Sequence, residues 1–437
     1  MSSKTPKYFD CYLRFPGGYA IIGVDSYRCL YRKGKTNDMI HERIETPVAY
    51  TTDVLVAGGG VAGIAAALAA ARSGARVILL ERGFMLGGLA TAGLVTIYLP
   101  LCDGEGTQVS FGLAEELLHL SMEHGAEDRY PTPWLEGGTK EERCKLRYEV
   151  QFNAQLFAIS CERLLRESGV KILYGATAVA VTERDGRIDN VIIESKSGRE
   201  AIAVLRCAVD ATGDADLCHL SSAKTALHGY DNALAGWYYY FSAGEYKLKQ
   251  YGYAPSALRK NPALLTGPIG KKGYDGTSLE GVTSFMLDSH AAIEADVLAR
   301  RAAGEQDLVP TTVATTPQFR MTRRLDGMYT LDEAEVKQHF DDSIGMVSDW
   351  RARGPIFEIP FGTLRGREVK NLLTAGRCIS VTDAMWDITR VIPDCAVTGE
   401  AAGVAAAMTD DLDALDVAAL QRELVARGVK LHLEDIV

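Results

Sequence analysis

Residues 53–81 read DVLVAGGGVAGIAAALAAARSGARVILLE. A short run rich in β-formers, 53–57, leads straight into the glycine turn 58–63. An alanine-rich segment then ends at Ser73-Gly74, and a second apolar run stops on Glu81. Strand, glycine turn, helix and strand within about 30 residues are typical of a βαβ unit. The stretch therefore predicts an α/β fold built on a parallel sheet.

The turn has the spacing G-x-G-x-x-G, and each glycine has its own role in that pattern. Gly58 allows the tight turn, Gly60 lets the backbone approach a pyrophosphate, and Gly63 lets the helix pack close to the strand. The first helical N–H groups, at Val61 and Ala62, then point at the phosphates. An isolated motif of this kind also fits a glycine-rich turn in an unrelated α/β protein.

The acid at the end of the second strand favours dinucleotide binding over that alternative. Glu81 lies 21 positions after Gly60, where a carboxylate accepts hydrogen bonds from an adenosine ribose. Gly87 and Gly88 follow Glu81-Arg82 and allow a loop to pass close to a bound cofactor, or they belong to a plain flexible loop.

The composition excludes several classes of protein. The 437 residues are 47% hydrophobic with a net charge of −10, and they contain no long basic run, so nucleic acid is not an expected partner. Nine cysteines without a C-x-x-C pair indicate free thiols in a reducing compartment and no metal site. The N-terminus lacks an apolar signal region, and glycines and arginines interrupt residues 54–80, so we expect a cytoplasmic protein without a membrane span.

Two amphipathic helices are expected next, over 111–124 and 150–168, with a polar surface excursion over 125–145 between them. Three β runs with hairpin turns over 178–209 predict an inserted antiparallel meander. The last run leads into Asp210-Ala211-Thr212-Gly213-Asp214-Ala215-Asp216. Amides and a carboxylate at a strand end favour ligand binding, although helix capping by an aspartate is an alternative.

The chain divides by composition into four parts. We expect an N-terminal arm over 1–50, a dinucleotide domain over 51–222, a substrate domain over 223–365, and a return to the first domain over 366–437. The third part contains Arg320, Arg323 and Arg324, which form either a solvated face or an anion clamp. The fourth contains Gly376-Arg377 after an apolar run, and a small-residue helix expected to start at 399–403.

With these motifs in view, the chain resembles the FAD-dependent oxidoreductases of the glutathione-reductase-like flavoprotein fold, distantly akin to the fumarate reductase flavoprotein group. The resemblance covers about residues 45–410. It rests on the glycine turn with LGGLATAGLV, on VDATGDAD, FRMTRRLDGMYTL and FEIPFGTL, and on NLLTAGRCIS followed by TRVIPDCAVTGEAAG. It implies a Rossmann-like FAD-binding domain with a parallel central sheet and an inserted antiparallel meander, plus a second mixed α+β substrate domain.

The resemblance also implies a set of site residues. FAD would be held at the turn and strand ends by Gly58, Gly60, Val61, Ala62, Gly63, Glu81, Arg82, Gly87, Gly88, Val179, Gly213, Asp214, Gly376 and Arg377. The helix start at Gly399, Ala401, Ala402 and Gly403 would face the isoalloxazine. Substrate and chemistry would fall to Arg320, Arg323, Arg390, Asp383 and Asp387, because this chain has Asp383 and Trp386 where relatives often carry histidines.

These residues predict an FAD-dependent oxidoreductase that moves a hydride between flavin N5 and a small substrate, anionic or oxygen-rich because of the arginines. Only one G-x-G-x-x-G is present, so an external electron donor or acceptor is expected. A homo-oligomer is an open alternative for its assembly. The other hypotheses are an NAD-dependent Rossmann enzyme and a non-redox binding protein on a flavoprotein scaffold.

Overall fold

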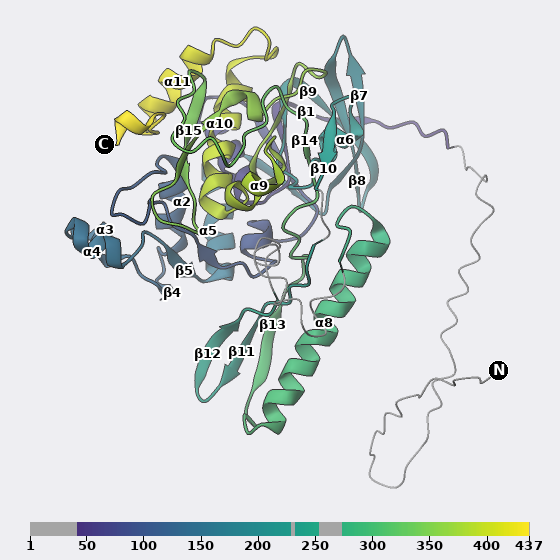
Figure 1. Ribbon diagram of the computed structural model, residues 1–437. Coiled ribbons are helices and arrows are strands. Elements are labelled where there is room, and N and C mark those ends of the chain that lie inside the picture. Colours follow the sequence, from purple (N-terminus) through teal and green to yellow (C-terminus); the bar gives the residue numbers. More distant parts are fainter. Residues whose placement is uncertain (1–41, 229–231, 253–272, 437) are drawn as a thin grey trace, which may run out of the picture. The chain divides into compact units, whose positions relative to one another are not determined.

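A computed structural model of the chain describes residues 42–228, 232–252 and 273–436 (Figure 1). The described residues from Thr46 onward belong to one compact unit. The predicted N-terminal arm lies, up to residue 41, outside the described residues, as does much of the glycine- and lysine-rich loop before Gly276. The predicted boundaries between substrate domain and cofactor domain stay a prediction.

The centre of this unit is a sheet of seven strands in the order β6-β2-β1-β9-β8-β7, with β17 also paired to β9. The parallel strands are β1 (Val48–Ala57), β2 (Val77–Glu81), β6 (Lys171–Tyr174), β9 (Gly198–Asp210) and β17 (Leu372–Thr374). The predicted meander is formed by β7 (Thr177–Arg184), β8 (Arg187–Ser195) and β9, paired antiparallel. The fold class predicted from the sequence is thereby confirmed.

One face of the sheet is covered by a pair of small-residue helices, α1 (Val61–Arg72) and α10 (Ile392–Met408) (Figure 1). They approach so closely that a Cβ added at Gly399 would lie 2.3 Å from the backbone O of Ala62. A Cβ at Gly403 would lie 2.2 Å from the O of Ala66. The two pairs of contacts run in the same sense along both helices, so α1 and α10 are roughly parallel.

The predicted start of the C-terminal small-residue helix at Gly399 is wrong. The helix α10 begins at Ile392, seven residues earlier, and has Pro393 in its first turn. Proline is well tolerated there because the first turn needs no N–H donor. Gly399, Ala401, Ala402 and Gly403 are therefore buried inside the helix, and the two glycines serve its packing against α1.

The secondary structure of residues 97–167 differs from the two predicted helices. The second predicted helix is shorter, because Val150–Phe152 is the strand β5 and α5 occupies only Ala154–Glu167. The expected polar excursion contains short helices and a strand. The other elements here are β3 (Ile97–Tyr98), α2 (Leu113–Ser121), β4 (Ala126–Asp128), α3 (Thr132–Leu135) and α4 (Lys140–Lys145).

The predicted aromatic strand is β11 (Tyr238–Ser242), in a three-stranded sheet with β12 (Glu245–Lys249) and β13 (Val309–Val313). The long helix α8 (Leu279–Ala302) runs beside this sheet (Figure 1). Tyr238 and Tyr240 share a small hydrophobic core with Ile293 and Val297 of the helix. This core is separate from the main core around α1 and α10.

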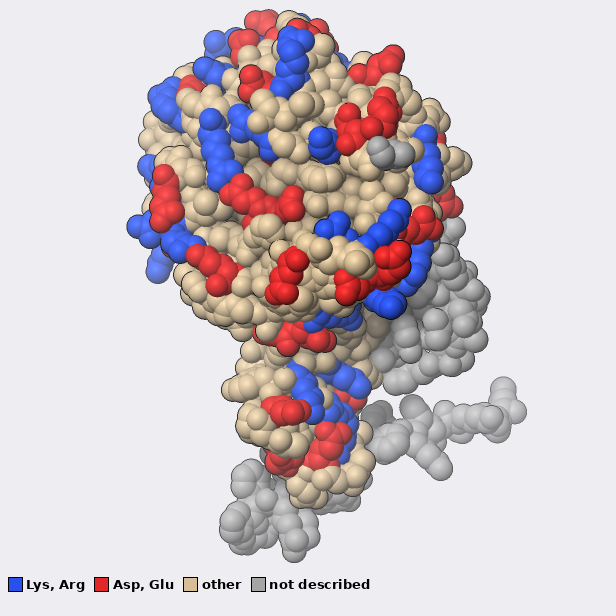
Figure 2. Space-filling view, turned by 90° about the vertical axis from the view of Figure 1, so that its left-hand side faces the viewer, with Lys and Arg blue, Asp and Glu red and all other residues tan. Residues whose placement is uncertain are grey.

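The remaining elements connect these parts. They are α6 (Asp216–Leu220), β10 (Thr225–Leu227), β14 (Arg323–Leu325), β15 (Ser343–Ser348), β16 (Ile356–Pro360), α9 (Asp383–Thr389), α11 (Val417–Ala426) and the 3-10 turns η1 (Gly88–Ala90), η3 (Phe361–Thr363), η4 (Gly376–Cys378) and η5 (Leu433–Asp435). All seven cysteines in the described ranges are free thiols. Basic and acidic side chains alternate on the face drawn in Figure 2.

Within the described ranges, no single helix has the length and apolar composition needed to cross a membrane. The pair α9 and α10 meets the criterion only when taken together, and the two helices are bent by 91° at their junction.

Candidate functional site

The carboxyl ends of the central strands open into a cavity with about 1370 Å³ of empty space, part of it continuous with solvent. Its wall includes the glycine turn, the end of β2, the segment after β9, the segment before Phe319, and the N-terminus of α10. Ligands of open α/β folds bind at this edge of the sheet.

Three glycines of the turn have three different surroundings. Gly58 has φ +101°, and a Cβ there would lie 2.5 Å from the O of Ala211. A Cβ at Gly63 would lie 1.8 Å from the O of Gly58, so only glycine fits. A Cβ at Gly60 would meet nothing within 4 Å, because this residue faces the cavity. Gly58 and Gly63 are thus required by the fold, whereas Gly60 leaves room for a ligand.

Helix α1 presents an uncapped N-terminus to the cavity. Its N-cap is Gly60, which has no side chain to accept from the first-turn N–H groups, and Val61 and Ala62 line the cavity. The unpaired amides and the helix dipole attract an anion at this position.

Glu81 holds the two glycine loops together. Its Oε2 accepts from the N–H of Gly59 at 2.8 Å, and its Oε1 accepts from the N–H of Gly83 at 2.6 Å. The N–H of Gly87 donates to the O of Gly59 at 2.8 Å, which brings the second glycine loop against the first. Each carboxylate oxygen keeps a further lone pair for a ligand hydroxyl.

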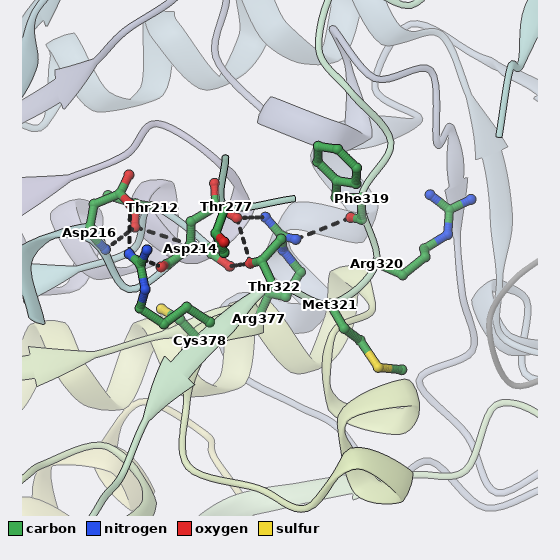
Figure 3. Close-up of polar contacts among 12 residues, drawn as sticks. Thr212, Asp214, Asp216, Thr277, Phe319, Arg320, Met321, Thr322, Arg377 and Cys378 are labelled. Atoms are coloured by element: carbon green, nitrogen blue, oxygen red, sulfur yellow. Dashed lines mark hydrogen bonds and ion pairs between the residues drawn. The ribbon is translucent and has the colours of Figure 1, made fainter. Parts of the chain in front are cut away.

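Asp214 is the centre of a polar network on the opposite wall (Figure 3). Its Oδ1 accepts from the hydroxyl of Thr322 and from Nη2 of Arg377, both at 2.7 Å. Arg377 also donates through Nη1 to the O of Phe319 at 3.2 Å. The network joins the end of β9, the segment before β14 and the turn η4, which are far apart in the sequence.

The backbone after β9 is shaped by Thr212. Its hydroxyl donates to Asp210 at 2.7 Å and accepts from the N–H groups of Asp214 and Asp216. Asp216 is the first residue of α6, and the N-cap is Ala215 at φ +52°, so the capping alternative does not describe this turn. Burial, with the nearby charges of Asp214 and Asp210, raises the pKa of Asp216 to about 6.

A second charged group lies at the other end of the cavity. Arg390 lines the cavity, and its Nη2 donates to Oδ1 of the buried Asp387 at 2.6 Å. Arg351 donates to the other oxygen of Asp387 at 3.1 Å. The Nε of Arg390 is buried and makes no hydrogen bond with any residue that the structure describes.

Arg320 belongs to this second group, although it does not itself line the cavity. Burial and repulsion from Arg390 lower the pKa of Arg320 to about 9, against the attraction of Asp387. Its Nη1 donates to the O of Gln318, and its guanidinium lies 5.7 Å from the Trp237 ring centre. In Figure 3 it points away from the Asp214 network.

Arg323 is not placed with Arg320 and Arg390. Its Nη1 donates to the O of Asp214 at 3.3 Å and lies 3.6 Å from Oδ1 of Asp216. The predicted arginine group is thus divided, with Arg323 at the Asp214 network and Arg320 at the other end of the cavity.

Asp383 has a neighbour that sequence reasoning missed. Its Oδ1 lies 3.0 Å from Nδ1 of His228, whose side chain is buried edge-on against Trp386. His228 stands alone after β10, 155 positions before Asp383, and no motif marks it. The pairing arises because β10 pairs with β14, which carries His228 to the region of α9.

The cavity wall contains twelve of the predicted residues: Gly58, Gly60, Val61, Ala62, Glu81, Arg82, Gly87, Gly88, Gly213, Asp214, Arg377 and Arg390. The predicted residues outside this wall are Gly63, Val179, Gly376, Gly399, Ala401, Ala402, Gly403, Arg320, Arg323, Asp383 and Asp387. Val179 lies at an irregularity between the β7–β8 pairs of Ala178 and Ala180. Sequence reasoning missed the wall residues Thr316 and Pro317, which belong to no quoted motif, and Ile392 and Cys395, which lie within the motif TRVIPDCAVTGEAAG but were not singled out.

Comparison with solved structures finds matches at low identity and with TM-scores below 0.5. A geranylgeranyl bacteriochlorophyll reductase-like protein from Thermoplasma acidophilum is 12% identical over 87% of this chain and 82% of its own, with a TM-score of 0.42. The p-nitrophenol 4-monooxygenase of Pseudomonas putida is 12% identical over 86% of this chain and 84% of its own, with a TM-score of 0.45.

Among curated proteins, a thioredoxin reductase from Ureaplasma parvum is 36% identical over 70 residues. The match spans 16% of this chain and only 23% of that reductase. The family model of the FAD dependent oxidoreductases matches residues 53–236 and 282–424, which is most of the sequence. The chain therefore belongs to the FAD-dependent oxidoreductase family, and FAD is its cofactor.

Proposed function

We propose that FAD binds in the cavity, with its adenosine end at Glu81 and its flavin end at Arg390. We further propose that a hydride passes there between flavin N5 and a small, anionic or oxygen-rich organic substrate. Bound FAD supplies the two-electron acceptor or donor. An external electron donor or acceptor would complete the cycle.

The glycine turn supports the proposed placement of the pyrophosphate. The space at Gly60 and the uncapped N-terminus of α1 are what a phosphate group needs for close approach. Gly59, Gly83 and Gly87 are held in place by the Glu81 bonds and the loop contact, which supports a site that needs little rearrangement on binding. In this proposal Asp214 and Arg377 hold the middle of the cofactor.

The helix pair supports the proposed length of the site. Gly399 of α10 lies against Ala62 at the start of α1, and α10 begins seven residues before Gly399. At a rise of 1.5 Å per residue, the N-terminus of α10 extends about 10 Å beyond that of α1. Two positive helix ends therefore face the cavity at different depths, as a long cofactor with two electron-rich parts requires.

The proposed substrate class rests on the balance of charges around Arg390. Asp387 lies within hydrogen-bond distance of Arg351 and Arg390, and it also offsets the charge of buried Arg320. An anionic or oxygen-rich substrate beside Arg390 would supply the acceptor that the buried Nε of Arg390 lacks among the described residues. Asp387 would then orient Arg390 and would not carry a proton.

We keep Asp383 as the proposed acid/base for the proton that accompanies the hydride, with the proton passing to it from the cavity, because neither Asp383 nor His228 lines the cavity wall. His228 at 3.0 Å would share that proton with it. Carboxylate and imidazole groups in contact exchange protons readily near neutral pH.

The first test is anaerobic mixing of the purified yellow protein with hydroxy acids, unsaturated acids and sugars. Bleaching of the flavin by an oxygen-rich or anionic compound supports the proposal. For the reverse direction, the flavin is reduced with dithionite, and the same panel is screened for reoxidation. A protein that binds FAD but exchanges electrons with none of these compounds would contradict the proposed substrate class.

The second test compares Arg390→Ala with Arg301→Ala. Arg301 lies in α8, where it donates to the O of Leu308 and does not line the cavity. Loss of Arg390 should lower kcat/KM at least about 100-fold while FAD stays bound, because a charged hydrogen bond to substrate is removed. Turnover that is unchanged in Arg390→Ala removes this residue from the mechanism.

A further inference from the structure

A group of three metal-ligating side chains lies outside the cavity. His339, Glu358 and His432 each offer one ligand atom, and these atoms all lie within 4.8 Å of one another. None of the three lines the cavity. The proposed flavin chemistry uses none of them, so the group has another role.

Glu358 is fixed as an acceptor in a buried position. It lies on β16 and is 3% exposed, with Ile356, Phe357 and Ile359 as its apolar neighbours along the strand. Its oxygens accept from the N–H groups of Phe340 at 2.9 Å and Leu433 at 3.2 Å. A buried carboxylate requires a positive partner as well as hydrogen bonds.

Both histidines present Nδ1 to this carboxylate. Nδ1 of His432 lies 3.0 Å from Oε2 of Glu358, and Nδ1 of His339 lies 3.8 Å from Oε1. The two rings stack with centres 4.5 Å apart and planes at 27°. Two imidazoles on one carboxylate make a set of two nitrogens and one oxygen.

Two further carboxylates lie beside the histidines, of which Asp341 is fully exposed. Nε2 of His339 lies 3.4 Å from Oδ1 of Asp341, on the side of the ring opposite to the proposed ligand atom. Metal-ligating histidines characteristically donate their second N–H to such a carboxylate, which fixes the tautomer. Oδ2 of Asp435 accepts from the N–H groups of Leu431 and His432 and so fixes the backbone that carries His432.

We propose that His339, Glu358 and His432 bind one zinc ion, with a water as the fourth ligand. Tetrahedral zinc with bonds of 2.0–2.1 Å places its ligand atoms about 3.3 Å apart. Nδ1 of His432 lies 3.0 Å from Oε2 of Glu358, whereas Nδ1 of His339 lies 3.8 Å from the other oxygen, Oε1, and the three ligand atoms lie within 4.8 Å of one another, so the ring of His339 would move inward on binding. His339 is about half exposed, so its ring has room to complete the site.

The ion would join three segments that are separated in the sequence. His339 precedes β15, Glu358 lies on β16, and His432 stands at the start of the final turn η5. A bound zinc would therefore fasten the C-terminal segment to β16 and raise the stability of the folded chain.

The experiment uses the full-length holoprotein, freed of metal with a chelator. Calorimetric titration with Zn²⁺ should show one equivalent bound, and elemental analysis should confirm it after dialysis. Mg²⁺ should not bind, because it prefers an all-oxygen octahedral shell. Saturating Zn²⁺ should raise Tm, whether or not a flavin substrate has been found.

Variants locate the ion. His339→Ala and His432→Ala should each weaken Zn²⁺ binding by more than about 10-fold, and Asp341→Asn by about 10-fold. His124→Ala is the matched control, because His124 is an exposed histidine beside one carboxylate, Glu123 at 3.8 Å, and it should change nothing. If His432→Ala fails to fold, His339→Ala alone decides, because its half-exposed side chain is dispensable for packing.

The proposal is overturned if the metal-free holoprotein binds no Zn²⁺. It is equally overturned if His339→Ala binds Zn²⁺ as tightly as the parent protein. Loss of binding in His124→Ala would place the ion elsewhere and would also contradict it.

Discussion

The two ends of the cavity are built from different materials. At the adenosine end the backbone shapes the site. A Cβ at Gly58 or Gly63 would collide with neighbouring backbone atoms, whereas a Cβ at Gly60 would enter open space. At the other end, the long charged side chain of Arg390 lines the cavity and is held by Asp387, and Arg320 lies behind it without reaching the cavity wall. Backbone contacts depend on a short local sequence, whereas side-chain networks depend on how distant segments meet. The first end is therefore recognisable in the sequence, and the second is assembled only by the fold.

The largest expected effect tests the backbone end. In Gly63→Ala the new Cβ would lie 1.8 Å from the O of Gly58, so the turn and α1 must separate. We expect a loss of about 3 kcal/mol or more in the free energy of unfolding, measured by urea denaturation.

Gly60→Ala is the matched control for that variant. Its Cβ would enter open space in the cavity, so Tm should stay the same while FAD binds about 10-fold more weakly. Equal stability of both variants would show that the two glycines do not differ in role.

At the arginine end, Asp387→Asn should cost about 3 kcal/mol in the free energy of unfolding. The change removes the carboxylate partner of the mostly buried Arg390, whereas Arg351 keeps Asp349 as a second partner. Asp349→Asn is the control, because Arg351 would keep Asp387 as a partner. If Asp349→Asn proved as costly as Asp387→Asn, the central role of Asp387 would be wrong.

Glu400 brings a charge into the small-residue packing around α10. Burial raises its pKa from 4.5 to about 7, although its Oε2 accepts from the N–H of Leu113 at 2.7 Å. The folded state therefore binds the proton more tightly than the unfolded state, and stability falls as the pH rises from 4.5 to 7. Glu400→Gln should remove this loss and gain about 3 kcal/mol in the free energy of unfolding above pH 7, measured by denaturation at several pH values.

Asp53→Asn should alter the pH dependence of stability in the opposite direction, measured in the same denaturation experiment. The hydrogen bonds from Arg76 lower the pKa of Asp53 from 3.8 to about 2, so its stabilisation is present above pH 4 and is lost as the pH falls towards 2. A Glu400→Gln profile that runs parallel to that of the parent protein between pH 4.5 and 7 would contradict the raised pKa.

The smallest expected effect lies between the two ends. Asp214→Asn weakens the bonds from Thr322 and Arg377, and we expect FAD to bind about 10-fold more weakly, as followed by flavin fluorescence. Asp216→Asn should change the affinity for FAD less. The pKa of Asp216 is raised from 3.8 to about 6, so its carboxyl group gives up its charge more easily than an ordinary aspartate does. A larger effect of Asp216→Asn would reverse the assigned importance of the two carboxylates.

The sequence predicted the fold class and the cofactor because both depend on local patterns. The spacing from Gly58 to Glu81 specifies a strand, a turn and a helix within one short segment. The start of α10 was misplaced because Gly399 and Gly403 were interpreted as facing a ligand. Glycine also serves close helix packing, and only the contact with α1 distinguishes the two roles.

Side chains that meet across the fold were beyond sequence reasoning. His228 and Asp383 are 155 positions apart, and His339 and His432 are 93 positions apart. No spacing rule connects residues at such distances, so neither pairing was predicted. Arg320 and Arg323 show the reverse case, because these neighbours in one motif have different partners: Arg320 donates to the O of Gln318, whereas Arg323 donates to the O of Asp214.

The close contact of α1 with α10 has a consequence for motion. Backbone pressed against backbone at Gly399 and Gly403 leaves no side-chain layer that could shear, so the two helices move as one body. Opening and closing around a substrate must then come from segments outside the pair. We expect such motion in the helix α8 and the strands β11–β13, which share a small core of their own.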